Sequence, residues 1–183
     1  MRKSRFSLTH GESMTDPKSI PRGEMSVTDP ARTDSAGRST VAADIERGVT
    51  RLLMAQGIAA VSELPLPDGR RADMVGLSAD GLTTIVEIKS SVADFQCDQK
   101  WTAYRSYCDR LFFAVPPAFP VEILPEDTGL ILADRYGGSV VREAPAHRIA
   151  GARRKVMMLR FGRAAAARLA RGRDPGADGM SEF

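Results

Sequence analysis

Cysteine is scarce in this sequence, with Cys97 and Cys108 the two among 183 residues. Two cysteines are too few for a disulfide-based scaffold. The chain also lacks any run approaching the ~20 apolar residues that span a bilayer. Its N-terminus carries basic residues without the apolar segment of a secretory signal. We therefore expect a cytoplasmic protein that does not associate with membranes.

Apolar residues are also sparse in the first forty positions, where Ser and Thr recur and Pro and Gly are scattered. Such a segment cannot bury enough surface to offset its ordering entropy. We predict a disordered leader at 1–40, a core domain at 41–146, a basic C-terminal helix at 147–173 packed on that core, and a flexible tail at 174–183. The length suits one domain with a core of its own plus such tails.

Acidic residues are missing from the C-terminal part: between His147 and Arg173 there are nine basic residues and no acid. This contrasts with a formal net charge of only +3 for the whole chain. A concentration of positive charge favours a phosphate-rich partner, because Lys and Arg neutralise backbone phosphates without reading sequence. Charge pairing with the end of a helix dipole would account for only two or three of the nine.

A helical projection of this basic segment separates apolar from cationic side chains. One side carries Met158, Phe161, Ala165 and Leu169, and the other largely carries Arg153, Arg160, Arg163, Arg168 and Arg171. A docked helix would therefore present a cationic ridge. Val156 and Met157 fit this projection poorly, so a strand at 155–161 is the alternative.

The remaining sequence alternates between strand and helix patterns. Helices are expected from Ser39 or Thr40 to about Gly57 and at 92–108, with apolar residues spaced three and four apart. Strands are expected at 59–66, 70–77, 84–89, 111–115, 129–133 and 139–142, being short aliphatic or β-branched runs bounded by turn residues. A short helical turn can interrupt the Pro-containing connection at 118–127. This order indicates a mixed α/β sheet with helices packed against it.

The strands at 70–77 and 84–89 carry the candidate site. The Asp80-Gly81 pair between them favours a tight antiparallel hairpin, which places Asp73 near Glu87 and Lys89. Alternation along the strand puts Glu87 and Lys89 on one face. Two neighbouring carboxylates repel each other unless a cation lies between them, and Mg²⁺ prefers such oxygen ligands. The ion would polarise a scissile phosphate, while Lys89 positions or deprotonates the attacking water.

Each of these residues also has a plainer interpretation. A Glu-x-Lys pair on a strand usually marks a surface ion pair worth roughly 0–1 kcal/mol. Glu46, at the border of the first helix's apolar stripe, is equally well explained as a solvated flank residue. Asp94 and Asp98 are interpreted as a solvated helix face. Trp101 can stack on an exposed base, but its place on an apolar stripe favours core packing.

Asp73 followed by Glu87-Ile88-Lys89, with Glu46 in a preceding helix, resembles the PD-(D/E)XK nuclease superfamily. The resemblance covers roughly residues 42–142 and implies a restriction-endonuclease-like fold. It implies catalytic roles for Asp73, Glu87, Lys89 and Glu46, and a divalent metal (Mg²⁺, or Mn²⁺) held by Asp73, Glu87 and Ile88. Ala72 stands where the superfamily's motif has proline. Lys100 and Tyr104 form a Lys-x-x-x-Tyr version of the Gln-x-x-x-Tyr motif found in some members.

Several longer segments, covering most of residues 42–170, look like the MmcB-type bacterial DNA-repair proteins, among them 71–73, 86–91, 98–101, 104–115, 152–155 and 165–169. This resemblance implies a repair endonuclease acting on damaged or structured DNA. Residues expected to contact DNA are Lys100, Arg153, Arg154, Lys155, Arg160 and Arg163. Two alternatives stay open: a catalytically silent DNA-binding module that recruits other repair factors, and an RNA-processing nuclease. A dimer is compatible with the sequence, which carries no signature for or against one.

Overall fold

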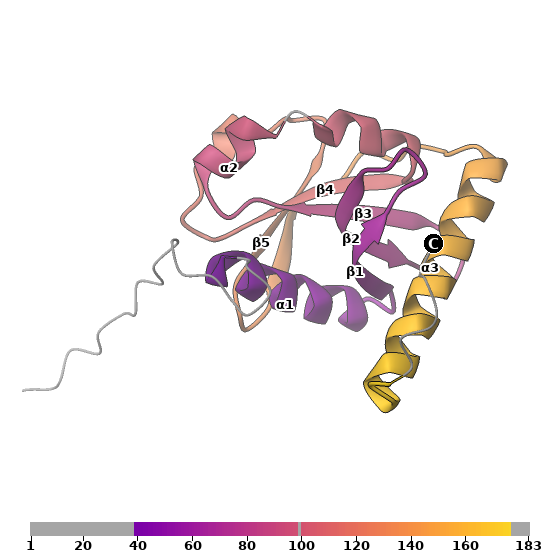
Figure 1. The fold of residues 1–183 in the computed structure, drawn as a ribbon. Coiled ribbons are helices and arrows are strands. Elements are labelled where there is room, and N and C mark those ends of the chain that lie inside the picture. Colours follow the sequence, from indigo (N-terminus) through magenta and orange to yellow (C-terminus); the bar gives the residue numbers. More distant parts are fainter. Residues whose placement is uncertain (1–38, 99, 177–183) are drawn as a thin grey trace, which may run out of the picture.

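The computed structural model describes residues 39–98 and 100–176, so most of the predicted leader and most of the predicted tail lie outside the described residues. Within these ranges the chain forms a six-stranded sheet with strands in the order β1-β2-β3-β4-β5-β6 (Figure 1). No helix in the described ranges is long and apolar enough to cross a membrane. The predicted mixed α/β fold, with helices against the sheet and a C-terminal helix, is confirmed.

The sheet joins an antiparallel meander to a parallel half. Strands β1 (Ala59–Pro65), β2 (Arg71–Leu77) and β3 (Thr83–Ile88) pair antiparallel. Strands β4 (Arg110–Val115) and β5 (Gly129–Ala133) run parallel to β3, and β6 (Gly138–Arg142) returns antiparallel to β5. All strands fall where the sequence predicts them. Because β3, β4 and β5 are parallel, their carboxyl ends meet at one edge of the sheet.

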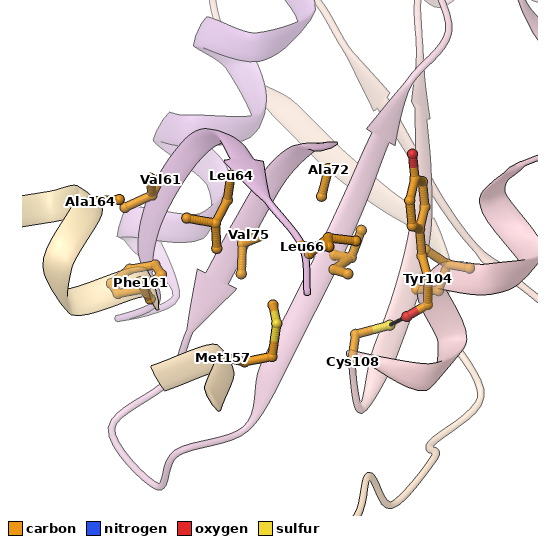
Figure 2. Close-up of a cluster of buried hydrophobic side chains, with 12 residues drawn as sticks. Val61, Leu64, Leu66, Ala72, Val75, Tyr104, Cys108, Met157, Phe161 and Ala164 are labelled. Atoms are coloured by element: carbon orange, nitrogen blue, oxygen red, sulfur yellow. Dashed lines mark hydrogen bonds between the residues drawn. The ribbon is translucent and has the colours of Figure 1, made fainter. Parts of the chain in front are cut away.

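Helices cover both faces of the sheet. Helix α1 (Thr40–Ala55) buries Ile45 and Val49 in a cluster with Met74 and Val86. Helix α3 (Gly151–Arg173) packs in a second cluster with Val75 and Ile85, as Figure 2 shows for Met157 against Val75. Neighbouring residues of β2 and β3 therefore point to opposite helices, as strand alternation requires.

Helix α1 begins at its predicted cap, where the Ser39 side chain accepts a hydrogen bond from the Ala42 N–H. Its middle lies unusually close to the hairpin between β5 and β6. A Cβ added at Gly48 would come within 2.2 Å of the Asp134 carbonyl oxygen and 2.4 Å of the Gly137 carbonyl oxygen. Glycine is therefore required at this helical position by backbone contact.

Gly48→Ala is expected to lower the free energy of unfolding by about 1–3 kcal/mol, because neither backbone carbonyl can yield without moving the hairpin. Gly162→Ala is the matched control, since an added Cβ there meets nothing within 4 Å on helix α3. That change should stabilise the protein by up to about 1 kcal/mol through helix propensity. Urea unfolding of both variants checks the pair, and equal effects would contradict the close approach.

The prediction of a single helix at 92–108 is wrong. The chain forms a short helix α2 (Val92–Cys97) and a 3₁₀ helix η1 (Lys100–Ser106), and Asp98 between them is extended, with φ −107° and ψ 100°. The Asp98 carboxylate accepts the Lys100 N–H at 2.9 Å and the Lys89 ammonium at 2.6 Å. These side-chain bonds compete with helical ones and end the helix. Cys97 is accordingly exposed instead of lying on an apolar stripe.

The C-terminal helix forms, but it begins at Gly151, and the apolar face predicted for it is partly wrong. The buried residues are Met157, Phe161, Ala164 and Ala167, of which Figure 2 labels the first three. Met158 and Leu169 are 42% and 58% exposed. The strand alternative for 155–161 is also wrong. Because residues 164–167 are all alanine, several faces of the helix have similar hydropathy. The face that is buried is the one that contacts β1 and β2.

Three arginines of the basic C-terminal segment form hydrogen bonds within the fold. Arg154 forms a bidentate ion pair with Asp109, with both N···O distances at 2.7 Å. Arg160 donates to the Pro65 carbonyl oxygen, and Arg168 donates to the Ser62 carbonyl oxygen. These bonds tie α3 to β1 and to the segment before β4.

Candidate active site at the carboxyl end of β3

A cleft of about 870 Å³ opens at the carboxyl end of β3. Its walls come from the first turn of α1, the β1–β2 turn, the ends of β2 and β3, helix α2 and the start of η1. The charged side chains that line it are Glu63, Asp68, Arg70, Arg71, Asp73, Glu87, Lys89, Asp94, Asp98 and Lys100. Sequence positions from 42 to 104 therefore converge on one cavity.

Asp73 and Glu87 lie side by side across the β2–β3 ladder, as the hairpin predicts. The Asp73 N–H donates to Glu87 Oε1 at 3.3 Å, and the Ile88 N–H donates to Asp73 Oδ2 at 2.9 Å. Glu87 is 2% exposed, whereas Asp73 is half-buried at the cleft wall. The two carboxylates are thus fixed by backbone groups of the opposite strand.

Lys89 follows β3 on the same face and is 3% exposed. Its ammonium lies 2.6 Å from Asp98 Oδ2 and 3.8 Å from Glu87 Oε2. A buried ammonium needs compensating negative charge, which Asp98 supplies at hydrogen-bonding distance. Lys89 is therefore held in position by an acid from the far side of the cleft.

Burial and mutual repulsion disturb the titration of these groups. Desolvation, followed by the charge of Asp73, raises the pKa of Glu87 to about 8. Desolvation also raises the pKa of Asp73, although the Ile88 N–H and Lys89 oppose the shift. Burial acts to lower the pKa of Lys89, but the hydrogen bond to Asp98 and the charge of Glu87 outweigh it and raise that pKa. The lysine therefore stays an ammonium near neutral pH.

The structure does not bring every predicted residue into the cleft. Glu46 accepts a hydrogen bond from the Ser62 hydroxyl on β1 and is not among the residues that line the cavity. Ile88 and Lys100 do line it. Trp101 packs edge-on against Phe113, with ring centroids 5.5 Å apart, so its core interpretation is confirmed.

Asp98 is the residue that sequence reasoning missed, because a continuous helix would have placed it on a solvated face. Its position two residues before Lys100, in the segment 98–101 that resembles the MmcB-type proteins, was the available signal. Tyr104 also lines the cleft, and its hydroxyl donates to the Arg71 carbonyl oxygen at 3.2 Å. Glu63 forms an ion pair with Arg71, with an N···O distance of 3.4 Å.

The donor set can be tested against a divalent metal. Among the described residues, no cluster of three or more His, Cys, Asp and Glu side chains is arranged to hold a metal ion. The cleft instead offers two adjoining carboxylates, Asp73 and Glu87. Mg²⁺ is commonly bound through one or two carboxylates, with waters and substrate phosphates completing its shell. The residues present fit that ion, and they do not form a closed protein cage.

Fold and site together define an α/β protein whose mixed sheet carries a buried acid pair and a lysine at its edge. The family model of the MmcB-like DNA repair proteins matches residues 28–176, and the chain belongs to this family. No curated protein matches it.

Two solved structures are similar to this chain. SPO1766 from Silicibacter pomeroyi, a protein of unknown function, has 44% sequence identity and a TM-score of 0.74 over 79% of this chain and 97% of its own. A repair endonuclease from Pyrococcus abyssi has 18% identity and a TM-score of 0.27 over 39% of this chain and 37% of its own. The first match covers nearly the whole relative, so the two proteins share a fold over the aligned part.

Proposed function

We propose that this protein is a cytoplasmic, divalent-metal-dependent endonuclease that hydrolyses phosphodiester bonds in damaged or structured DNA. The observation that carries the proposal is the buried Asp73–Glu87 pair facing Lys89 in an open cleft. A protein that only binds polyanionic DNA gains nothing from a carboxylate pair, which repels the backbone. Membership of a DNA repair family supports DNA as the partner.

Asp73, Glu87 and the Ile88 carbonyl are the groups that would hold Mg²⁺ or Mn²⁺. When bound, the ion supplies Lewis-acid polarisation of the scissile phosphate. The protein's own contribution is to fix both carboxylates before substrate arrives, through the Ile88 and Asp73 N–H groups. Fixed groups need no reorganisation during the reaction, which is how preorganised sites lower a barrier.

Lys89 acts in this proposal as a cation and not as the general base. The raised pKa keeps its ammonium charged, so it can hold the attacking water and offset charge that grows on the phosphate. Asp98 positions Lys89 from the opposite wall at 2.6 Å. Arg70, Arg71 and Lys100 at the cleft margin can contact the phosphates on either side.

Metal-dependent cleavage by the purified protein tests the proposal. Plasmid, branched and cross-linked DNA, with RNA of matched sequence, should be incubated with Mg²⁺, Mn²⁺ or EDTA. We expect DNA cleavage with either metal and none in EDTA, and no cleavage by an Asp73→Asn preparation, which controls for contaminating nucleases. Metal-dependent binding without cleavage of any substrate would favour the silent DNA-binding module. Preferential cleavage of RNA would favour the RNA-processing nuclease.

A further inference from the structure

The hairpin between β5 and β6 carries Tyr136, whose side chain is 76% exposed. Large aromatic side chains normally bury most of their surface, so a ring held in solvent is informative. Arg135 lies over this ring, with its guanidinium carbon 5.7 Å from the centroid. The pair presents an aromatic face beside a positive charge.

The exposure of Tyr136 does not come from a loose loop. Asp134 Oδ1 accepts the Tyr136 N–H at 2.8 Å and the Gly137 N–H at 3.1 Å. Arg51 of helix α1 donates to the carbonyl oxygens of Arg135 and Tyr136, at 2.7 Å and 3.0 Å. The hairpin backbone is thus pinned on both sides. A rigid, exposed ring loses little freedom when it contacts a ligand.

A groove of about 500 Å³ lies beside this ring, with Pro117, Leu132 and Ser139 among its other lining residues. Pro117 follows β4 and the hairpin follows β5, so the groove lies at the carboxyl ends of these strands. Glu87 and Lys89 end the parallel neighbour β3. Strand β5 is two strand spacings of ~4.8 Å from β3, and the groove and the cleft lie at the same edge of the sheet.

The charges around the hairpin favour a polyanion. Arg51 and Arg135 lie at the hairpin, whereas Arg47, one turn from Arg51 on α1, is ion-paired with Asp44 at 2.9 Å. The acid of the hairpin, Asp134, is engaged by two backbone N–H groups. One aromatic ring among arginines is too small an apolar area for a protein interface, but it suits base stacking next to a phosphate backbone.

We propose that Tyr136 is a stacking platform for an unpaired base of single-stranded DNA, with Arg135 contacting the adjoining phosphate. The inference rests on the proposed function for its partner, and it adds a preference for substrates in which a single-stranded segment leads into the Asp73–Glu87 cleft. In a fully paired duplex the bases stack on one another, so none is exposed for stacking on the Tyr136 ring.

Fluorescence anisotropy in EDTA tests the stacking without requiring cleavage. The probes are a labelled 20-nucleotide single strand and a blunt 20-base-pair duplex of the same sequence, with the full chain. Tyr136→Ala should weaken single-strand binding at least about fivefold, because stacking contributes roughly 1–3 kcal/mol per base. Tyr136→Phe should retain the affinity, and duplex binding should change less than about twofold. Val141→Ala, 57% exposed on β6, is the matched control.

Two further readouts separate stacking from charge. A 2-aminopurine base in the strand should change its emission with wild type and Tyr136→Phe, and not with Tyr136→Ala. Arg135→Gln should reduce the salt dependence of single-strand binding by about 0.7 in the log–log slope, whereas Tyr136→Ala should leave the slope unchanged. Equal single-strand affinity for wild type and Tyr136→Ala, or no single-strand binding at all, would overturn the inference. Because EDTA prevents metal-dependent cleavage, absence of nuclease activity would leave this result standing.

Discussion

Glu87→Gln is expected to abolish cleavage and yet to stabilise the metal-free protein. The substitution removes one of the two carboxylates that would hold the ion, which is worth several kcal/mol of transition-state stabilisation. Cleavage should therefore fall at least roughly a hundredfold. In EDTA the same change removes a buried carboxyl whose ionisation is opposed by desolvation and by Asp73, so Tm should rise. Initial cleavage rates and thermal unfolding measure the two effects.

The stability effect has a defined pH dependence. The pKa of Glu87 is about 8 in the folded protein and near 4.5 in the unfolded chain. Between these values the folded state binds more protons than the unfolded state, so stability falls as pH rises. In EDTA the gain in stability of Glu87→Gln over wild type should therefore be small at pH 5 and large at pH 9. Comparing Tm at both pH values tests the sign.

Metal addition supplies the complementary test. A ligand that binds only the folded state at a hundred times its Kd stabilises by about 2.7 kcal/mol. Mg²⁺ should raise the Tm of wild type and leave that of Glu87→Gln unchanged. Glu122→Gln, at an exposed position in the connection before β5, should behave as wild type in every assay. An equal Mg²⁺ response in all three proteins would contradict a metal site at Glu87.

Asp109→Ala is expected to lower the free energy of unfolding by about 3 kcal/mol or more, because it leaves the hydrogen-bond partners of a buried carboxylate unsatisfied. Asp109 is 3% exposed and accepts bonds from Arg154 and from the N–H groups of Thr83 and Ile149. For a domain of this size we expect Tm to fall by roughly 10 °C. Lys155→Gln, the exposed neighbour of Arg154, should change stability by less than about 0.5 kcal/mol.

Acid unfolding checks the same ion pair. Burial acts to raise the pKa of Asp109, but the hydrogen bonds from Arg154 and from the two N–H groups outweigh it and lower that pKa. The stabilisation is therefore present above the ordinary value of 3.8 and is lost as pH falls through the lowered one. Asp109→Ala should lose less stability than wild type on acidification below pH 4. If both lost the same amount, the pair would not be structural.

Local pattern was enough to predict all six strands and the central hairpin. Turn chemistry at Asp80-Gly81 fixes the register of β2 and β3, and strand alternation then places Asp73, Glu87 and Lys89 together. These properties depend on residues close in the sequence. The carboxylate pair was therefore predictable from a single stretch of about seventeen residues, 73–89.

Only the tertiary structure decided the partners of these groups. Asp98 reaches Lys89 because the chain breaks between α2 and η1, and no helical period signals that break. The buried face of α3 was set by its fit to β1 and β2, and the same packing brought Arg154, Arg160 and Arg168 into hydrogen bonds with the rest of the fold. The contact between the β5–β6 hairpin and α1 likewise arises from tertiary packing and has no signal in the sequence pattern. Spacing along the chain determines which side chains share a strand or helix, whereas desolvation and long-range contact determine what each side chain pairs with.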